Sequence, residues 1–383
     1  MSIQLIAGKA LDQSMIDQCK VAAYVAHLDS AKQSLISNVE ANYYYLRWCD
    51  RVFPVVVVND YLQSQSYVAS LFNTYILYSV EELEIIRLPK WLTSLLRNMI
   101  RGVGTLFNRQ KMDRVVYVNN WLVSTNVYPK DFAPTKEDIK QLVDIITQQF
   151  PKHTICFRSL TEALQQPFMK TLQDAEFFPL ASRQVYIFDG RNGQADQLLK
   201  HRDTQRDLKL KKKFQSYFKL DHEPNDINIQ QYKKMYEQLY IEKYCPLNPQ
   251  YSTQWLAMSA KINMIRFHTM YDKNDCVVGL NGIFQVDNVM SIPIFGYDCD
   301  SSPKLAYYRQ LVAECIADSI DQSLIYHASS GVSDFKLNRG ANAHIEYSFC
   351  YVEHLPKQER WQLKSLAKIV NGLGVKVMRV FKL

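Results

Sequence analysis

The stretch that decides the fold runs from Met290 to Ala328 and reads MSIPIFGYDCDSSPKLAYYRQLVAECIADSIDQSLIYHA. Its first part is rich in isoleucine and aromatic residues up to Tyr297, which predicts a strand. Ser302-Pro303 then begins a segment with helical apolar spacing, and proline suits the first helical turn because the N–H that it lacks has no partner there. Leu324–Ala328 again has strand composition. The stretch therefore predicts a strand–helix–strand unit.

The same order of elements occurs earlier in the chain. Arg114–Tyr128 predicts one or two strands, and Lys136–Phe150 predicts a helix that Thr135 caps. His153–Arg158 predicts the strand that follows. A chain of 383 residues is also too long for one ordinary core. We therefore predict an α/β (α+β) protein with two tandem domains, each a mixed central sheet flanked by helices.

The predicted organisation has four segments. Residues 1–195 form the N-terminal domain, and residues 196–225 form a basic connecting segment that contains the run Lys209–Lys213. Residues 226–356 form the C-terminal domain, and residues 357–383 form a basic terminal helix and tail.

Composition limits the classes of function. The net charge of +7 is too small for a nucleic-acid-binding footprint on a chain of this length. The eight cysteines are scattered without a C-x-x-C pair, which favours reduced thiols over a disulfide framework or a zinc site. The N-terminus lacks the pattern of a signal peptide, and apolar runs such as Val55–Val58 are too short to cross a bilayer. We expect a cytoplasmic protein without a membrane span. Tyrosine is frequent, with 24 copies, and suits clefts that hold a polar ligand.

Four signals in the second half carry a resemblance to a known family. They are a basic helix entry at Arg202–Phe214, Gly296-Tyr297-Asp298 at a strand end, Ser302-Pro303-Lys304-Leu305 at a helix start, and Asp334-Phe335-Lys336 followed by Arg339-Gly340. In this order they resemble the BioF-like branch of the GNAT acyltransferases. That branch is related to the Fem-type aminoacyl transferases, which carry two GNAT halves. The first half of the chain matches by pattern only.

The resemblance implies an enzyme that transfers an acyl group from an acyl-CoA or acyl-carrier thioester to an amine. It implies catalytic roles for Tyr297, Asp298 and Lys336, at a crevice beside the end of the strand. The residues implied to bind the donor are Ser302, Lys304, Leu305 and Arg339. The implied partners are an amine acceptor, which is an amino acid, an amino sugar or a peptide-like molecule, and an acyl carrier protein as a possible donor.

Several alternatives stay open. Lys304 stands where the family commonly has glycine, and the sequence has no R/Q-x-x-G-x-G/A loop, the usual pyrophosphate signature. A Fem-type transferase that depends on aminoacyl-tRNA is one alternative, and a non-catalytic GNAT-like binding module is another. Nucleic acid is a partner only under the first of these. Each implied site residue also has a purely structural interpretation as a cap, a turn or a solvated side chain.

The base is not assigned by the sequence. Imidazole titrates near neutrality, so the histidines are candidates beside Glu346. These histidines are His268, His327 and His344. No cluster of these residue types has metal-ligand spacing, so we predict no metal.

Overall fold

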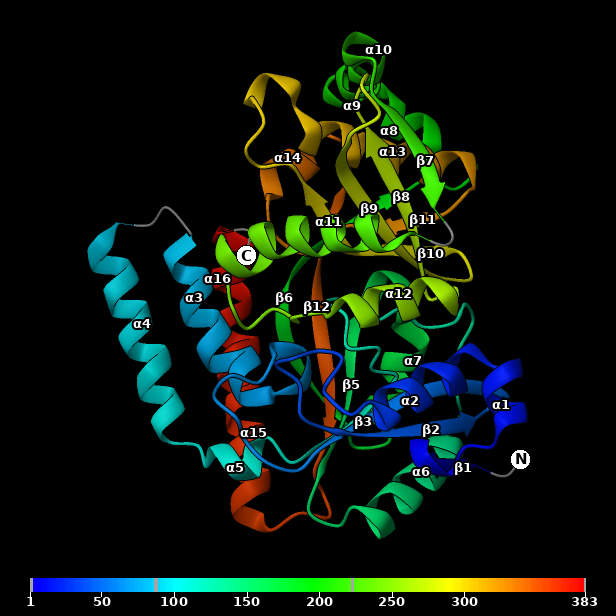
Figure 1. The fold of residues 1–383 in the computed structure, drawn as a ribbon. Helices are drawn as coiled ribbons and strands as arrows, with labels where there is room; N and C mark the ends of the chain where they lie inside the picture. Colours follow the sequence, from blue (N-terminus) through cyan, green and yellow to red (C-terminus); the bar gives the residue numbers. More distant parts are fainter. Residues whose placement is uncertain (1–2, 86–88, 222–223, 382–383) are drawn as a thin grey trace.

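The computed structural model describes residues 3–85, 89–221 and 224–381. Residues 1–2, 86–88, 222–223 and 382–383, which fall within the predicted segments, lie outside the described residues. The described strands form one twelve-stranded sheet with the order β1-β2-β3-β4-β5-β12-β6-β11-β10-β9-β8-β7 (Figure 1). Both parallel and antiparallel pairs occur in it. The predicted α/β class with a mixed sheet and flanking helices is confirmed.

The strands have the following bounds: β1 (Gln4–Ala7), β2 (Asn42–Trp48), β3 (Arg51–Val58), β4 (Val115–Val118), β5 (Thr154–Thr161), β6 (Phe178–Asp189), β7 (Tyr217–Asp221), β8 (Ile265–Tyr271), β9 (Val277–Val286), β10 (Val289–Tyr297), β11 (Ile325–His327) and β12 (Asn342–Tyr351). The α-helices are α1 (Gln13–Gln18), α2 (Lys20–Ser30), α3 (Tyr78–Ile85), α4 (Lys90–Thr105), α5 (Arg109–Met112), α6 (Lys136–Gln149), α7 (Glu162–Asp174), α8 (Ala195–Lys200), α9 (Arg202–Leu208), α10 (Leu210–Phe214), α11 (Asp226–Tyr236), α12 (Thr253–Lys261), α13 (Tyr307–Asp321), α14 (Ser333–Leu337), α15 (Lys357–Ile369) and α16 (Val375–Phe381). Short 3-10 or π segments are η1 (Gly8–Ala10), η2 (Tyr67–Ala69), η3 (Asn73–Leu77), η4 (Glu237–Glu242), η5 (Pro303–Leu305) and η6 (Val370–Gly374).

Two strand–helix–strand units repeat along the chain, as the sequence predicts. In the first, β4 and β5 are parallel neighbours and α6 connects them. In the second, β10 and β11 are parallel neighbours and α13 connects them. Thr135 caps α6 in a reciprocal capping box with Asp138, which satisfies two N–H groups at the start of the helix.

The closing strands of the two halves are interleaved. β12, from the C-terminal half, lies between β5 and β6, and β6 in turn pairs with β11 of the C-terminal half. In Figure 1 these two long strands run through the middle of the molecule and join its lower and upper parts. Because strand pairing crosses residue 195 in both directions, the predicted domain boundary there does not separate two sheets and stays a prediction.

The predicted connecting segment is part of the C-terminal half. It contains α8, α9, α10 and the edge strand β7, which pairs with β8. α9 packs against α13. No strand was expected here, and none of the five residues of this edge strand is buried.

Two sequence-based expectations about element bounds are wrong. The helix expected from Ser302 begins only at Tyr307, after η5 and a left-handed Ala306 with φ of 54°. The buried amide of Gln310 donates to the Leu305 carbonyl and holds this break in place. The strand expected to continue after Val118 ends there, because asparagine side chains satisfy the backbone of the next residues.

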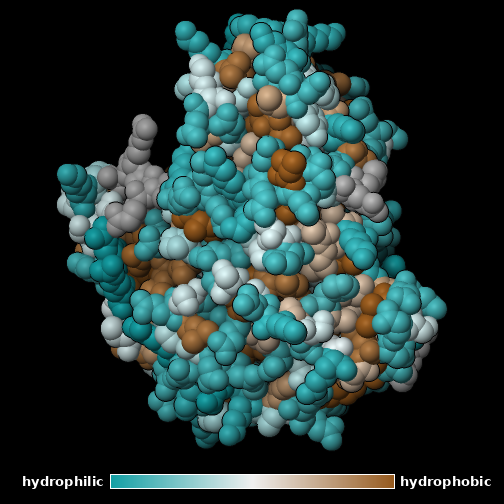
Figure 2. All heavy atoms as spheres, in the orientation of Figure 1, coloured by the Kyte–Doolittle hydropathy of each residue, from teal (hydrophilic) through white to brown (hydrophobic). Residues whose placement is uncertain are grey.

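The apolar core lies on both faces of the sheet. In the N-terminal half α6 and α7 cover one face through residues such as Ile139, Leu142 and Phe168, which pack against Val57 and Phe157. α4 leaves large apolar side chains exposed, and hydrophobic atoms gather on the surface in the region of α3 and α4 (Figure 2). These exposed residues are Trp91, Leu95, Met99 and Leu106. None of the described helices is long and apolar enough to cross a lipid bilayer.

Candidate functional site

A cavity lies where two parallel strands separate. β10 pairs with β11 only from Val289 to Ser291, and the register of β10 against β9 shifts between Ser291 and Ile294. Beyond this point β10 continues to Tyr297, whereas the chain after His327 turns into a loop. The resulting cavity has a volume of about 440 Å³, within the usual range of small-molecule sites.

Both halves of the chain line this cavity. The N-terminal half supplies Tyr67, Tyr78, Ser124, Thr125 and Arg183. The C-terminal half supplies side chains from η4, β10, α13, β11 and α14 and the loop 328–333. These include Tyr240, Tyr244, Phe295, Tyr297, Tyr308, Tyr326, His327 and Lys336. No aspartate or glutamate is among the described lining residues, so the charged groups at the wall are cationic.

Lys336 is the cation most closely tied to the cavity wall. Its side chain is buried, and its Nζ donates to the carbonyl oxygens of Ala328 at 2.6 Å, Ser330 at 2.7 Å and Ser329 at 3.3 Å. Three acceptors match the three N–H donors of an ammonium group. Burial, with a smaller effect from the Arg183 charge, lowers the pKa of Lys336 to about 7. Its charge therefore changes near neutral pH.

The tyrosines of the cavity are hydrogen-bond donors at neutral pH. Burial raises the pKa of Tyr240, Tyr297, Tyr308 and Tyr326 above the ordinary value for a phenol. A phenol with a raised pKa keeps its proton, so it can donate to an oxyanion or a thiolate but cannot act as a base. The rings of Phe295, Tyr297 and Tyr308 also contact one another and form an aromatic wall.

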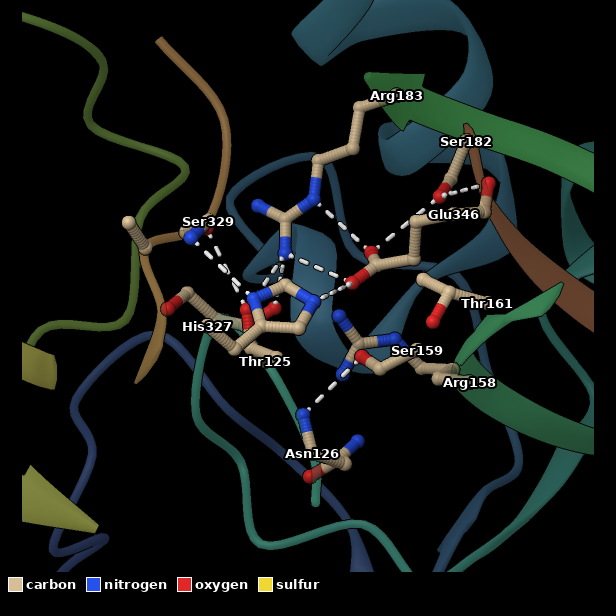
Figure 3. A network of polar contacts seen from close by, with 12 residues as sticks. Thr125, Asn126, Arg158, Ser159, Thr161, Ser182, Arg183, His327, Ser329 and Glu346 are labelled. Atoms are coloured by element: carbon tan, nitrogen blue, oxygen red, sulfur yellow. Dashed lines mark hydrogen bonds and ion pairs between the residues drawn. The ribbon is translucent and has the colours of Figure 1, made fainter. Parts of the chain in front are cut away.

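A buried ion pair lies at the boundary between the two halves (Figure 3). Arg183 on β6 donates from Nε to Glu346 Oε1 on β12 at 2.9 Å. It also donates to the Ser124 carbonyl at 2.7 Å and to Thr125 Oγ1 at 3.0 Å. Burial alone would raise the pKa of Glu346, but the charge and hydrogen bond of Arg183, together with smaller effects of His327 and Arg158, outweigh it and the pKa is lowered. The pair is therefore fully charged and fixes the strands against the loop after β4.

His327 lies between this ion pair and the cavity. Its Nδ1 accepts from the Ser329 N–H at 3.2 Å, which places the ring proton on Nε2. Nε2 faces Glu346 Oε2 at 3.9 Å, too far for a hydrogen bond. Burial lowers the pKa of His327 to about 4, so the ring is neutral at pH 7.

Of the residues that the sequence assigned to the site, Tyr297 and Lys336 meet at the cavity. This cavity lies beside the end of β10, where a crevice was expected, and the roles of the two residues stay a prediction. Asp298 is not among the lining residues; its carboxylate accepts from the Asp300 N–H at 3.0 Å and from the Ser301 hydroxyl, as a turn residue does.

The residues assigned to the donor lie outside the described lining of the cavity. Ser302 accepts from the Lys304 N–H at 3.4 Å, and its carbonyl accepts from the Leu305 N–H at 3.0 Å. Two of the N–H groups expected to bind phosphate, those of Lys304 and Leu305, therefore already have Ser302 as their partner. Arg339 is held by Asp207, with 2.7 Å between Nε and Oδ2, and its guanidinium lies 3.4 Å from the centre of the Phe335 ring.

The other candidate bases lie elsewhere. His344 is on β12 and does not line the cavity. His268 lies beside Glu314 and Asp318, and the three ligand atoms are within 4.8 Å of one another. The Lys211 ammonium already pairs with Glu314. Because an ammonium and a metal ion compete for the same carboxylate, this group is a salt-bridge cluster in the present structure, and the absence of a metal stays a prediction.

Sequence reasoning missed Arg183, Tyr240, Tyr308 and the loop 328–333. The abundance of tyrosine was a signal, but it could not show which of the 24 copies share a wall. Arg183 sits in a segment that reads as an ordinary closing strand, and only the interleaving of β6 and β12 brings it to Glu346.

Comparison with known proteins supports the fold. No protein-family model matches the sequence, and none of the curated proteins matches it. The structure is similar to FemX, with a TM-score of 0.53 and 7% sequence identity over 95% of this chain and 99% of that chain.

More distant likenesses include a tandem GNAT protein from the clavulanic acid biosynthesis pathway, with a TM-score of 0.40 and 7% identity over 93% of this chain and 100% of that chain. L-PGS from Bacillus licheniformis has a TM-score of 0.44 and 12% identity over 66% and 82% of the two chains. Both TM-scores are below 0.5, so neither likeness supports a conclusion about this chain. The similarity to FemX extends over nearly the whole of both chains, and the chain therefore shares the fold of FemX.

Proposed function

We propose that the protein is an N-acyltransferase that moves an acyl group from a thioester donor to an amine. The observation that carries the proposal is the cavity at the separation of β10 and β11, which combines a buried lysine with phenol donors and has no described carboxylate in its wall. Acyl transfer develops negative charge on the carbonyl oxygen, and preorganised cations and donors stabilise that charge. A cationic cavity suits this reaction.

The proposed reaction is direct. The amine nitrogen attacks the thioester carbonyl carbon, the C–S bond breaks, and the leaving thiolate takes up the proton that the amine releases. We assign to the Lys336 ammonium the stabilisation of the oxyanion through its charge. Tyr297 and Tyr308 are proposed to donate to the oxyanion or to the leaving sulfur, since both keep their protons at neutral pH.

We retain acyl-CoA or an acyl-carrier thioester as the proposed donor. The cavity fits the reacting end of such a donor because it is cationic and aromatic. Lys304 is exposed on η5 and is proposed to meet phosphate groups outside the cavity. Ser302, Leu305 and Asp298 are proposed to shape the surface around Lys304, where the donor phosphates would bind, and not to take part in the reaction. Arg339 is proposed to act through Asp207 and Phe335, which it holds in place.

The pH profile should reveal the charge state of Lys336. Its pKa is about 7, so the ammonium is present below neutral pH and is lost above it. We expect kcat/KM to fall about tenfold per pH unit on the alkaline side. The Lys336→Arg variant, which keeps its charge, should lose this limb in a profile from about pH 5.5 to 9. A rate that rises through pH 7 and lacks an alkaline limb would make Lys336 a base instead.

The proposal is tested with a panel of acyl-CoAs and amine acceptors, with free thiol as the readout. We expect thiol release that requires both substrates, together with a rise in Tm with the preferred donor. If no donor releases thiol with any acceptor and none raises the Tm, the transferase proposal fails. A rise in Tm without turnover would favour the non-catalytic binding module.

The alternative of a transferase that uses aminoacyl-tRNA has one specific support. The similarity to FemX covers 95% of this chain, and Lys209, Lys212 and Lys213 are exposed near α10. Under this alternative, charged tRNA should bind and the affinity should fall steeply with salt. Indifference to tRNA at low salt would exclude it.

A further inference from the structure

The C-terminal helix has one face fixed to the protein and one face open. α15, η6 and α16 continue one another from Lys357 to Phe381. Leu363, Leu366 and Ala367 are buried on the inner side. The Asn371 amide accepts from the Ala181 N–H at 2.8 Å and donates to the Pro179 carbonyl at 2.7 Å, which ties η6 to the backbone of β6. The opposite side is therefore held facing outward.

That outer side carries large apolar residues. Trp361 is 69% exposed, Leu373 is 54% exposed and Val380 is 71% exposed, with Ile369 beside them. Residues three or four apart share a helix face, and Ile369 and Leu373 have this spacing. At the Trp361 end, Gln362 donates to the carbonyl of Leu106, which is also strongly exposed. Apolar surface therefore extends along the helix and onto the end of α4.

Basic residues alternate with these apolar ones along the same helix. They are Lys357, Arg360, Lys364, Lys368, Lys376 and Arg379. Arg360 and Lys364 pair with Glu353, whereas the other four form no ion pair among the described residues. We call the exposed basic and apolar side chains from Lys357 to Val380 the C-terminal face. The acidic residue of α15, Glu359, turns toward Lys111 and pairs with it at 2.9 Å.

We propose that the C-terminal face docks on the surface of an anionic phospholipid bilayer. A tryptophan and aliphatic side chains that alternate with unpaired lysines match an interfacial helix, whose apolar groups enter the headgroup region while its cations meet lipid phosphates. The core of a protein–protein interface, by contrast, is depleted of lysine. The charge pattern therefore favours a lipid surface over a protein partner.

Docking would bring the candidate site close to the bilayer. Phe381, at the end of α16, lines the cavity described above. The same helix thus carries the C-terminal face and reaches the cavity wall. The docking proposal does not depend on the proposed acyl transfer, because it rests on the exposed side chains alone.

Cosedimentation of the full chain with vesicles tests the proposal. We expect binding to phosphatidylcholine vesicles with about 30% phosphatidylglycerol to be at least about tenfold tighter than to pure phosphatidylcholine, and to weaken as salt rises. Trp361→Ser with Leu373→Ser and Val380→Ser should weaken binding about tenfold or more. Lys368→Glu with Lys376→Glu and Arg379→Glu should abolish it. All six positions are exposed, so Tm should change little.

The matched control is Lys209→Glu with Lys212→Glu and Lys213→Glu, which makes the same change in net charge near α10. This control should bind anionic vesicles as the unaltered protein does. The proposal is overturned if the unaltered protein ignores anionic vesicles, or if the control loses binding as fully as the C-terminal charge variant. It is also overturned if the protein sediments as a dimer that the Trp361, Leu373 and Val380 changes convert to a monomer, since the face would then join two copies.

Discussion

Replacing Lys336 with methionine should lower kcat/KM for acyl transfer by about 100-fold, or roughly 3 kcal/mol of transition-state stabilisation. Methionine has a similar length but no charge and no donor, so the cavity keeps its shape and loses the cation that we propose stabilises the developing oxyanion. The three carbonyl groups that Lys336 now satisfies belong to a loop that lines the cavity. Water in the cavity can replace its N–H groups, so the variant should fold.

The matched control is Lys304→Met, at the exposed lysine of η5. If Lys304 meets the phosphates of the donor, this change should raise KM for the donor a few-fold and leave kcat unaltered. Initial rates at saturating and limiting donor separate the two effects, and the Tm of each variant checks its folding. A Lys336→Met enzyme with unchanged kcat/KM would remove Lys336 from the reaction and leave the cavity as a binding site only.

The Glu346→Gln variant should lower the free energy of unfolding by about 3–5 kcal/mol, because it leaves the Arg183 guanidinium buried without a counter-charge. Both side chains are almost wholly buried. The pair connects β6 with β12, and Arg183 further bonds to the loop after β4. Its loss therefore affects the seam where the two halves of the sheet interleave. Urea unfolding of the two proteins measures the difference.

Two further variants make this measurement specific. Removing both charges, as in Arg183→Met with Glu346→Leu, should cost clearly less than Glu346→Gln alone, because no unpaired charge remains. Glu237→Gln breaks the partly exposed pair with Lys233 and should cost no more than about 0.5 kcal/mol. A loss below about 1 kcal/mol for Glu346→Gln would show that water reaches Arg183 in the folded protein.

Local sequence patterns predicted the elements that depend on local forces. The helix after Thr135 is right because its capping box and apolar spacing act within a few residues. The strands around Tyr297 and Ile325 are right for the same reason. The start of α13 was missed because the left-handed turn at Ala306 depends on Gln310 and on its hydrogen bond with Ser216, which lies between α10 and β7. No local signal marks such a turn at an alanine.

The candidate site also contains residues that the motifs indicated and residues whose contacts only the structure shows. Tyr297 and Lys336 are in the cavity, as the motifs implied. The ion pair of Arg339 could not be seen from its motif alone, because its partner Asp207 is 132 residues away in the chain. The sequence alone is compatible with Asp298 as a reactive carboxylate or as a turn residue. In the structure its carboxylate accepts hydrogen bonds from Asp300 and Ser301, as a turn residue does.

The sequence by itself determined the α/β class and the repeated strand–helix–strand unit. These features follow from periodicity, capping and short motifs, which act over one or two turns of helix or one strand. Only the tertiary structure decided that the closing strands interleave, that Arg183 meets Glu346, and that tyrosines from both halves share one wall. Such contacts join residues more than 100 positions apart, and their stability comes from burial, which no local pattern of residues encodes.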